Sequence, residues 1–567
     1  MRKYCYLIFI ALLAGCNSNN FKPGKRIQEG AGLISKNGMV VSANYEASRI
    51  GALILEKGGN AIDAAVATGF ALAVCYPEAG NIGGGGFMLI RLADGRTDII
   101  DYREKAPLGA SRNMYIDPAG NVISRSSTDT HLASGVPGSV DGMLEAHRKY
   151  GRLPFSEIIQ PAIDLAENGY IIKSPQAYSF NRARKEFTDR NSKKPALVKD
   201  SLWKEGDLVR QPDLAATLRL IRDKGHEGFY TGKVAEMIVR EMDRGHGLIT
   251  MKDLDSYKSV WRTPLEGKYH NYTVITAPPP SGGGIALLQM LTMVEKYKLS
   301  ESGFHSVATM HLMIEAERRA FADRSFFAGD PDFVKIPVDK LIRGEYLSGR
   351  MSSFKADKAS LSSEIAHGSP EKEASEETTH YSVTDREGNA VSTTTTLNGS
   401  FGNSIFVEGA GFLLNNEMDD FSVKPGFPNM YGLTGGEANS IEPGKRMLSS
   451  MTPTIILKDE KLFIVTGSPG GSTIPTTVFQ VVVNAVDFGM NMQESADAGR
   501  FHHQWMPDLV YLENNSFDSI TIRKLEGLGH HLTTRSYIGS VNAIMKLNDG
   551  SFQGGADRRG NNSAASY

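Results

Sequence analysis

The chain has 567 residues, of which 41% are hydrophobic and 22% are charged, a balance typical of a globular protein with a large core. The formal net charge is −2 and no basic tract stands out, which argues against nucleic-acid binding. Only three cysteines occur, Cys5, Cys16 and Cys75, so the composition excludes a disulfide framework.

The N-terminus has the features of a secretory signal. Arg2 and Lys3 precede an apolar run at residues 4–13, which is too short to span a bilayer. Residues 13–16, LAGC, resemble a bacterial lipobox, which predicts an exported protein whose mature chain begins with lipidated Cys16 and is anchored to the membrane by acyl chains. An ordinary cleaved signal peptide that happens to end in Cys is the alternative. Because Asn17 is not Asp, the outer membrane or periplasmic side is favoured, without fixing the face.

Residues 17–37 are polar and contain glycine, which predicts a tether. Residues 61–74 place apolar side chains at helical spacing, so we expect a helix that begins after the loop Gly58, Gly59 and Asn60. Cys75 ends this apolar run and is interpreted as a buried small hydrophobe rather than a nucleophile. The following stretch, GNIGGGGFMLIRL, predicts a glycine-rich turn that runs into an apolar strand. A phosphate-binding loop is disfavoured there, because no Gly-Lys-Ser/Thr follows.

Two later segments allow two interpretations each. The run SGGG at 281–284 precedes an apolar helix, as anion sites do, although a tight loop is the commoner explanation. Residues 351–377 are rich in Lys, Glu, Ser and Ala and hold almost no large apolar side chain, so we expect them to be mobile. They fit an interdomain linker, or an arm that leaves once its C-terminal bond is cut.

After this segment the pattern changes to strands. Residues 380–384 alternate, residues 385–389 form a turn, and residues 390–397 form the return strand of a hairpin. The hairpin is rich in threonine, which suits a pleated surface, so its composition alone requires no chemistry. Over the whole chain, helix and strand signals occur in mixed order, without a βαβ rhythm or a repeat.

The familiar metal and hydrolase motifs are weak. His502 and His503 are adjacent and would point to opposite faces of a strand, which is poor spacing for metal ligands. Neither His-Glu-x-x-His nor Gly-x-Ser-x-Gly occurs. Asp419 and Asp420 in NNEMDDF fit a cation site and a polar loop equally well.

A set of longer motifs, in order along the chain, resembles the bacterial γ-glutamyltranspeptidases, also called glutathione hydrolases. The resemblance covers about residues 37–567 and is carried by GGNAIDAAVA, GNIGGGGFML, DYREKAP, HLASGVPG, APPPSGGG, ADRSFFAGDPDFV, TTHYSVTD, NNEMDDF, RMLSSMTPT, TGSPGGS and FHHQW. It implies an α+β fold, the four-layer αββα sandwich of the N-terminal-nucleophile hydrolases, built from two chains of one self-cleaved precursor. The large subunit would span residues 38–377, with the arm 351–377 at its end, and the small subunit residues 378–567.

The resemblance implies that the precursor cuts its own bond between Glu377 and Thr378. A threonine hydroxyl is a weak nucleophile until a base removes its proton. Cleavage would give Thr378 a free α-amino group, which titrates near roughly 7.7–8.0 and can serve as that base. Thr396 would hydrogen-bond Thr378 and hold its amine in line. The backbone N–H groups of Gly470 and Gly471 would form the oxyanion hole.

The same resemblance assigns the substrate site. Arg103 would grip the α-carboxylate of a γ-glutamyl group, a task that suits a bidentate guanidinium. Ser449 and Ser450 would donate hydroxyl hydrogen bonds to the same carboxylate. The α-ammonium would be bound by three acceptors, Asn398, Glu417 and Asp420.

Two further features of the site also follow from the resemblance. Many relatives have Gln where this chain has Glu417, so the site carries an additional acidic group. Residues 424–436 match a lid loop over the glutamyl pocket, with Tyr431 as its gating residue.

The implied reaction is acyl transfer. Thr378 would form a γ-glutamyl ester from glutathione or another γ-glutamyl amide and pass it to water or to the amine of an amino acid or peptide. No metal or cofactor is implied. The alternatives are a cephalosporin-type (glutaryl) acylase of the same fold and a non-catalytic peptide-binding lipoprotein. Arg103 and Asp420 favour a substrate with an α-amino-acid head group.

Overall fold

A computed structural model describes residues 28–30, 32–366 and 378–567. Its first large sheet has eight strands in the order β1-β20-β3-β11-β12-β4-β5-β8, and each neighbouring pair is antiparallel. The strands are β1 (Gln28–Glu29), β20 (Ser563–Ser566), β3 (Met39–Ser42), β11 (Thr379–Thr384), β12 (Ala390–Thr396), β4 (Gly85–Arg91), β5 (Thr97–Asp101) and β8 (Val260–Arg262).

The second large sheet has seven strands in the order β2-β19-β18-β14-β13-β10-β9 and is also antiparallel throughout. These are β2 (Ile34–Ser35), β19 (Phe552–Ala556), β18 (Asn542–Lys546), β14 (Lys461–Thr466), β13 (Thr454–Lys458), β10 (Tyr272–Thr276) and β9 (Leu265–Tyr269). Two small sheets complete the strands, one of β15 (Phe501–His503), β16 (Val510–Glu513) and β17 (Leu532–Arg535), the other of β6 (Tyr170–Ile171) and β7 (Leu208–Val209).

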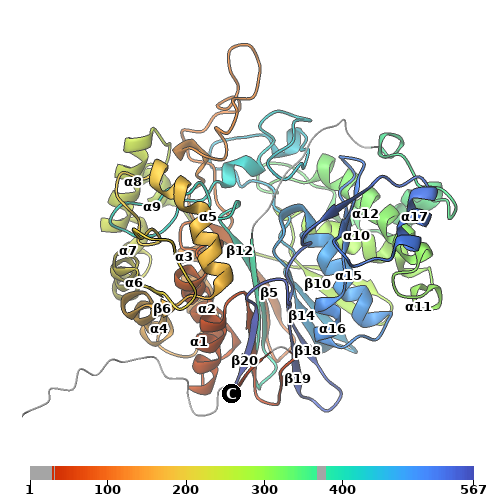
Figure 1. Cartoon of the computed structure of the whole chain (residues 1–567), viewed down its shortest axis with the longest axis horizontal. Coiled ribbons are helices and arrows are strands. Elements are labelled where there is room, and N and C mark those ends of the chain that lie inside the picture. The colour runs from red at the N-terminus through yellow and green to blue at the C-terminus, as the bar shows by residue number, and fades with distance from the viewer. Residues whose placement is uncertain (1–27, 31, 367–377) are drawn as a thin grey trace, which may run out of the picture.

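Helices cover the outer face of each large sheet (Figure 1). The first group is α1 (Tyr45–Glu56), α2 (Ala61–Cys75), α3 (Ser139–Tyr150), α4 (Phe155–Asn168), α5 (Ser174–Arg190), α6 (Pro212–Lys224), α7 (Glu227–Tyr230), α8 (Lys233–Gly245) and α9 (Met251–Ser256). The second is α10 (Gly283–Glu295), α11 (Leu299–Ser302), α12 (Val307–Phe327), α13 (Val338–Leu341), α14 (Gly344–Arg350), α15 (Ile474–Val486), α16 (Met492–Asp497) and α17 (Ser519–Gly527). Strands β11 and β12 pack against β18 and β14, so the two sheets lie face to face. The fold is therefore α+β, and its four layers are the predicted αββα sandwich.

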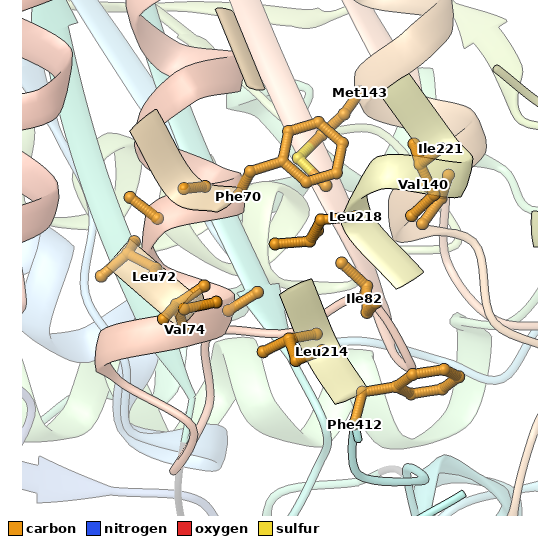
Figure 2. Close-up of a cluster of buried hydrophobic side chains, with 14 of the residues drawn as sticks. Phe70, Leu72, Val74, Ile82, Val140, Met143, Leu214, Leu218, Ile221 and Phe412 are labelled. Carbon is orange, nitrogen blue, oxygen red and sulfur yellow. The ribbon is translucent and has the colours of Figure 1, made fainter. Parts of the chain in front are cut away.

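The helical layer over the first sheet is built around α2. Each of its fifteen residues is buried, because it packs on α1 and α4 on one side and on β11 and β12 on the other. Figure 2 shows Phe70 of α2 beside Met143 of α3 and Leu218 of α6, in a continuous apolar core. The predicted start of the helix is confirmed, since Asn60 and Asp63 form a reciprocal capping box.

Cys75 is the last residue of α2 and is fully buried, as the sequence predicts. Burial raises the pKa of its thiol well above the ordinary value, so the thiolate form is disfavoured. The side chain therefore acts as a small apolar group of the core.

Two expectations about mobile segments are corrected. Residues 28–29 and 34–35, expected in a tether, form edge strands of the two large sheets, while residues 1–27, including Cys16, lie outside the described residues. Residues 351–366, expected in a mobile arm, contain short 3-10 turns at Met351–Ser353 and Ser362–Glu364 and bury the side chain of Ile365. The remainder of that arm, residues 367–377, lies outside the described part of the chain.

The packed part of this segment is fixed by Arg319 of α12 and by Asp508, which lies between β15 and β16. Arg319 donates to Ser353 Oγ at 2.9 Å and to Ser360 Oγ at 3.1 Å, and Ser362 N donates to Asp508 at 2.7 Å. Polar contacts of this kind leave no pattern of apolar residues in the sequence, so the composition of the segment does not predict its order. In the described part of the chain, no helix combines the length and apolarity needed to cross a bilayer.

Candidate active site

A narrow cavity lies where β12 ends, between the two large sheets. Its walls contain ten of the eleven residues predicted for catalysis and substrate binding, together with Met451 and Ile474. The ten are Arg103, Thr378, Thr396, Asn398, Glu417, Asp420, Tyr431, Ser449, Ser450 and Gly471. Gly470, the eleventh, is the chain neighbour of Gly471. A larger cavity of about 760 Å³ beside α6 and α8 contains none of them, so the chemistry of the walls and not their size identifies this site.

The β11–β12 hairpin brings Thr378 and Thr396 together. Its register pairs Thr379 with Thr395, which places Thr378, the residue before β11, next to Thr396 at the end of β12. Thr396 Oγ1 accepts the backbone N–H of Asn398 at 2.7 Å, so its own hydroxyl proton is free to point toward Thr378. Thr378 is 5% exposed, and its side chain lines the cavity.

The glycine run before β4 allows this close packing. A Cβ atom on Gly84 would lie 2.0 Å from the carbonyl oxygen of Thr396, and one on Gly86 would lie 2.3 Å from that of Thr394. The stretch therefore has a packing role beneath the hairpin. This agrees with the rejection of a phosphate-binding loop.

Gly470 and Gly471 lie between β14 and α15, at the start of a 3-10 turn, Gly471–Thr473, that leads into the helix. Gly470 has φ of +131°, and a Cβ there would meet Thr473 Oγ1 at 2.4 Å, so only glycine fits. Among the described residues, neither glycine N–H has an acceptor. Two unused N–H groups ahead of a helix are suited to stabilise an oxyanion.

Arg103 is almost completely buried and forms ion pairs with both Glu417 and Asp420. Its Nη2 also donates to the carbonyl oxygen of Leu448 at 3.0 Å. Burial opposes the charged guanidinium, but the carboxylates of Glu417 and Asp420 outweigh it and raise the pKa of Arg103. Cationic and anionic groups therefore adjoin in one cavity, as recognition of a carboxylate and an ammonium on the same carbon requires.

The two serines are held by neighbouring loops. Ser449 forms an isolated β-bridge with Ser281. In addition, Gly282 N donates to the carbonyl oxygen of Ser449 at 2.9 Å. A Cβ on Gly283 would lie 2.4 Å from the carbonyl oxygen of Ser450. The SGGG run is thus the turn into α10, with Gly283 and Gly284 already in the helix, and its close packing supports both serines.

Tyr431 closes the cavity from the predicted lid loop. Its Oη donates to the carbonyl oxygen of Asn398 at 2.5 Å, and its own carbonyl oxygen accepts Gln504 Nε2 at 3.1 Å. Asp419 accepts the N–H of Met430 at 2.7 Å and the hydroxyl of Ser127 at 2.6 Å. Asp419 therefore anchors the loop, which favours the polar-loop interpretation over a cation site.

Two charged residues at the site were not singled out from the sequence. Glu104 Oε2 lies 3.8 Å from Arg103 Nη1, yet neither carboxylate oxygen of Glu104 has a hydrogen-bond partner in the described structure. Burial raises the pKa of Glu104 to about 8. Arg324 of α12 donates to Ser450 Oγ at 2.7 Å, and burial lowers its pKa to about 10. Glu104 lies in the motif DYREKAP and Arg324 in ADRSFFAGDPDFV, and membership of these motifs is the sequence signal that could have pointed to both residues.

The adjacent histidines have separate partners. His502 Nδ1 lies 2.8 Å from Thr476 Oγ1, whereas His503 Nδ1 accepts the N–H of Trp505 at 3.0 Å. Burial lowers the pKa of His502 to about 3 and that of His503 to about 4. Their arrangement fits the prediction that they do not form a metal-binding pair.

Comparison with known proteins identifies the family. A family model described as gamma-glutamyltranspeptidase matches residues 47–567. The glutathione hydrolase proenzyme of Escherichia coli strain K12 is 47% identical over 93% of this chain and 91% of its own. That of Bacillus subtilis strain 168 is 38% identical over 98% of this chain and 97% of its own. The acylase ACY 1 proenzyme of Pseudomonas sp. strain SE83 is 36% identical over 92% of this chain and 91% of its own.

Solved structures agree with this result. Cephalosporin acylase from Bacillus halodurans superposes with a TM-score of 0.81 at 26% identity, over 97% of this chain and 98% of its own. A chain of Helicobacter pylori gamma-glutamyltranspeptidase gives a TM-score of 0.57 at 46% identity, over 61% of this chain and 97% of its own. With a family model over most of its length and relatives aligned from end to end, the chain belongs to the gamma-glutamyltranspeptidase family.

Proposed function

We propose that the protein is a self-processing γ-glutamyltransferase that also hydrolyses glutathione. The observation that carries the proposal is the single cavity in which Thr378 and Thr396 adjoin Arg103 and its carboxylate partners. The hydroxyl pair supplies a nucleophile, and the charged groups supply a site for the α-amino-acid end of a γ-glutamyl donor. Neither set alone would specify the reaction.

Acylation begins at Thr378 once cleavage after Glu377 has freed its amine. The amine takes the proton of its own hydroxyl, and Oγ attacks the γ-carbonyl carbon. The N–H groups of Gly470 and Gly471 stabilise the oxyanion, at about 2.7–4 kcal/mol for each such donor. As the intermediate collapses, the C–N bond breaks and the proton passes from the Thr378 ammonium to the leaving amine.

Deacylation repeats the same steps with a different nucleophile. Water or an acceptor amine gives a proton to the Thr378 amine as it attacks the ester carbonyl. Collapse of the second tetrahedral intermediate breaks the bond to Oγ, and the proton returns to the hydroxyl. The products are glutamate or a new γ-glutamyl amide.

The test is Thr378→Ala. We expect this variant to remain one uncut chain and to release no glutamate, because it lacks the hydroxyl needed for both reactions. Gel electrophoresis and a γ-glutamyl-p-nitroanilide assay measure the two effects. The matched control is Thr384→Val at the far end of β11, whose buried hydroxyl has no partner among the described residues; it should be cut and active. Cleavage and activity in the Thr378→Ala variant would remove Thr378 from the mechanism.

The acylase alternative shares the nucleophile and differs in the head group. A glutaryl chain has no α-ammonium, so it would leave Glu417 and Asp420 without a cationic substrate partner. The buried pairs of Arg103 with both acids therefore favour γ-glutamyl donors. A comparison of γ-glutamyl and glutaryl amides as substrates separates the two activities.

We also propose that Cys16 is lipidated and holds the enzyme at a bacterial membrane, with the outer membrane or periplasmic side favoured. The LAGC sequence supports this, and Cys16 lies outside the described residues. Cys16→Ser should move the protein from the membrane fraction to the soluble fraction, with unchanged specific activity. A wild-type protein that is fully soluble after export would contradict the anchor.

A further inference from the structure

A second cavity, of about 430 Å³, lies directly beside the catalytic one. At three places in the chain, one residue lines the catalytic cavity and the residue next to it in sequence lines the second cavity. Asn398, Glu417 and Tyr431 line the catalytic cavity, and their neighbours Gly399, Asn416 and Met430 line the second one. Consecutive Cα atoms are about 3.8 Å apart, so the partition is one residue thick. We call this second cavity the outer chamber.

The partition is held by contacts that a substrate can replace. Tyr431 Oη donates to the carbonyl oxygen of Asn398 at 2.5 Å, and Asn398 Nδ2 donates to the carbonyl oxygen of Asn416 at 3.0 Å. Gly399 N donates to Asn416 Oδ1 at 2.9 Å. Of these four residues only Tyr431 belongs to the lid loop. Its displacement would break the bond to Asn398 and open the partition on the lid side, while the two bonds that Asn416 accepts remain.

The outer chamber contains an unpaired cation. Arg190 is already engaged, through Asp129 at 3.2 Å and the carbonyl oxygen of Asn403 at 2.7 Å. Arg182, on the same helix α5, makes neither an ion pair nor a side-chain hydrogen bond to any residue that the structure describes. It is therefore available to a carboxylate of a ligand.

Two acceptors in the chamber also lack partners. Glu186 Oε2 and Ser400 Oγ are buried, and neither has a hydrogen-bond partner within the described structure. Glu186 stands four residues after Arg182, which places both side chains on the same face of α5. Buried polar atoms without partners are uncommon and are satisfied when a polar ligand enters.

We propose that the outer chamber binds the peptide portion of donor and acceptor, with Arg182 holding its terminal carboxylate. This rests on the proposed transferase function. The acceptor amine must reach the ester carbon at Thr378, so the rest of an acceptor dipeptide has to extend away from the glutamyl group. An extended dipeptide spans about 7 Å, enough to cross a partition one residue thick. The peptide N–H groups then meet Glu186 and Ser400.

The experiment compares two acceptors that differ in one charge. Glycylglycine has a terminal carboxylate, and glycylglycinamide does not. With γ-glutamyl-p-nitroanilide as donor, the wild-type enzyme should show a KM for glycylglycine at least about tenfold lower, as a charge-assisted hydrogen bond implies. Arg182→Ala should raise the KM for glycylglycine by a similar factor and abolish the difference. Hydrolysis without acceptor should not change.

The donor side gives a second readout. Glutathione leaves a dipeptide with a carboxylate, whereas p-nitroaniline has none, so Arg182→Ala should raise the KM only for glutathione. The matched control is Arg184→Ala on the same helix, because Arg184 donates outside the chamber to the carbonyl oxygens of Ser201 and Asp200. It should behave as wild type.

Two outcomes would overturn the assignment of Arg182. One is an unchanged preference for glycylglycine over its amide in Arg182→Ala. The other is an equal loss of transfer and acceptor-free hydrolysis, which would mark a general structural defect. Failure of the proposed function looks different, since wild-type enzyme would then not release p-nitroaniline even without an acceptor.

Discussion

Arg103 faces three carboxylates, of which Glu104 and Glu417 are buried and Asp420 is partly exposed, and burial affects the protonation of this cluster. Glu104, Glu417 and Asp420 each have a raised pKa because burial penalises their charged forms, although Arg103 acts in the opposite direction. Arg324 also lowers the pKa of Asp420, so two guanidinium groups face three carboxylates. Glu104, whose pKa is raised to about 8, is the member of the cluster that keeps its proton near neutral pH.

Glu104 provides a test of this protonation, because its pKa is about 8 in the folded protein and about 4.3 in an unfolded chain. Between those values the folded protein keeps a proton that the unfolded chain has lost. Raising the pH through this window therefore lowers the free energy of unfolding, by at most about 1.4 kcal/mol per pH unit. Glu104→Gln carries no titrating group and should show a shallower decline.

Urea unfolding at pH 5, 6, 7 and 8 measures this decline. Both proteins should carry Thr378→Ala, so that single uncut chains are compared. Glu387→Gln is the control, because Glu387 is an exposed acid paired with Arg152, and it should leave the decline unchanged. Equal declines with and without Glu104 would mean that this carboxyl group is ionised in the folded state.

At this scale the sequence named ten of the residues that line one cavity. Arg103, Thr378 and Asp420 were recognisable because each stands in a motif that the family resemblance covers. Glu104 and Arg324 also stand in motifs that carry the family resemblance, but the resemblance assigned them no role. Their importance is visible only in three dimensions, from two unpartnered oxygens and a bond to Ser450.

Among the elements, those with regular periodicity were predicted well. Helix α2 begins at its capping box and ends at Cys75, within one residue of the expected range, and the threonine hairpin has the expected strands and turn. Apolar spacing marks such elements because one face or all faces are buried. Two-residue strands such as β1 and β2 have no period to detect.

The segment after α14 shows a second reason for failure. Its polar composition predicts mobility if burial of apolar area is the only source of order. Here Arg318 and Arg319 of α12 are themselves buried and need acceptors, and Ser353, Ser360 and Ser362 supply them. The order of this segment is thus a consequence of buried charges in a distant helix.

In the whole molecule, the two predicted subunits are interleaved. In the first sheet, β11 and β12 from beyond Thr378 lie between β3 and β4 from before it, and β20 lies on the other side of β3. In the second sheet, four strands from beyond Thr378 lie between β2 and β9–β10. The order of strands in space could not be read from local patterns, because neighbours such as β3 and β11 are far apart in sequence.

This interleaving predicts that cleavage between Glu377 and Thr378 leaves one cooperative structure. Removing either chain would expose unpaired strand edges and divide the apolar core that contains Ile100 and Tyr381. The processed enzyme should therefore elute from a sizing column as one particle, yet give two bands on a denaturing gel. In urea, probes on the two chains should report the same unfolding midpoint, since neither chain retains a complete sheet alone.

Refolding should then separate the cut and uncut forms. The uncut Thr378→Ala chain keeps its strands covalently connected, whereas two separate chains must first meet, which makes their recovery dependent on concentration. Light scattering and recovered native protein after dilution from urea measure the difference. If the small chain left the native particle without unfolding of the large one, the interleaved sheets would not be what holds the enzyme together.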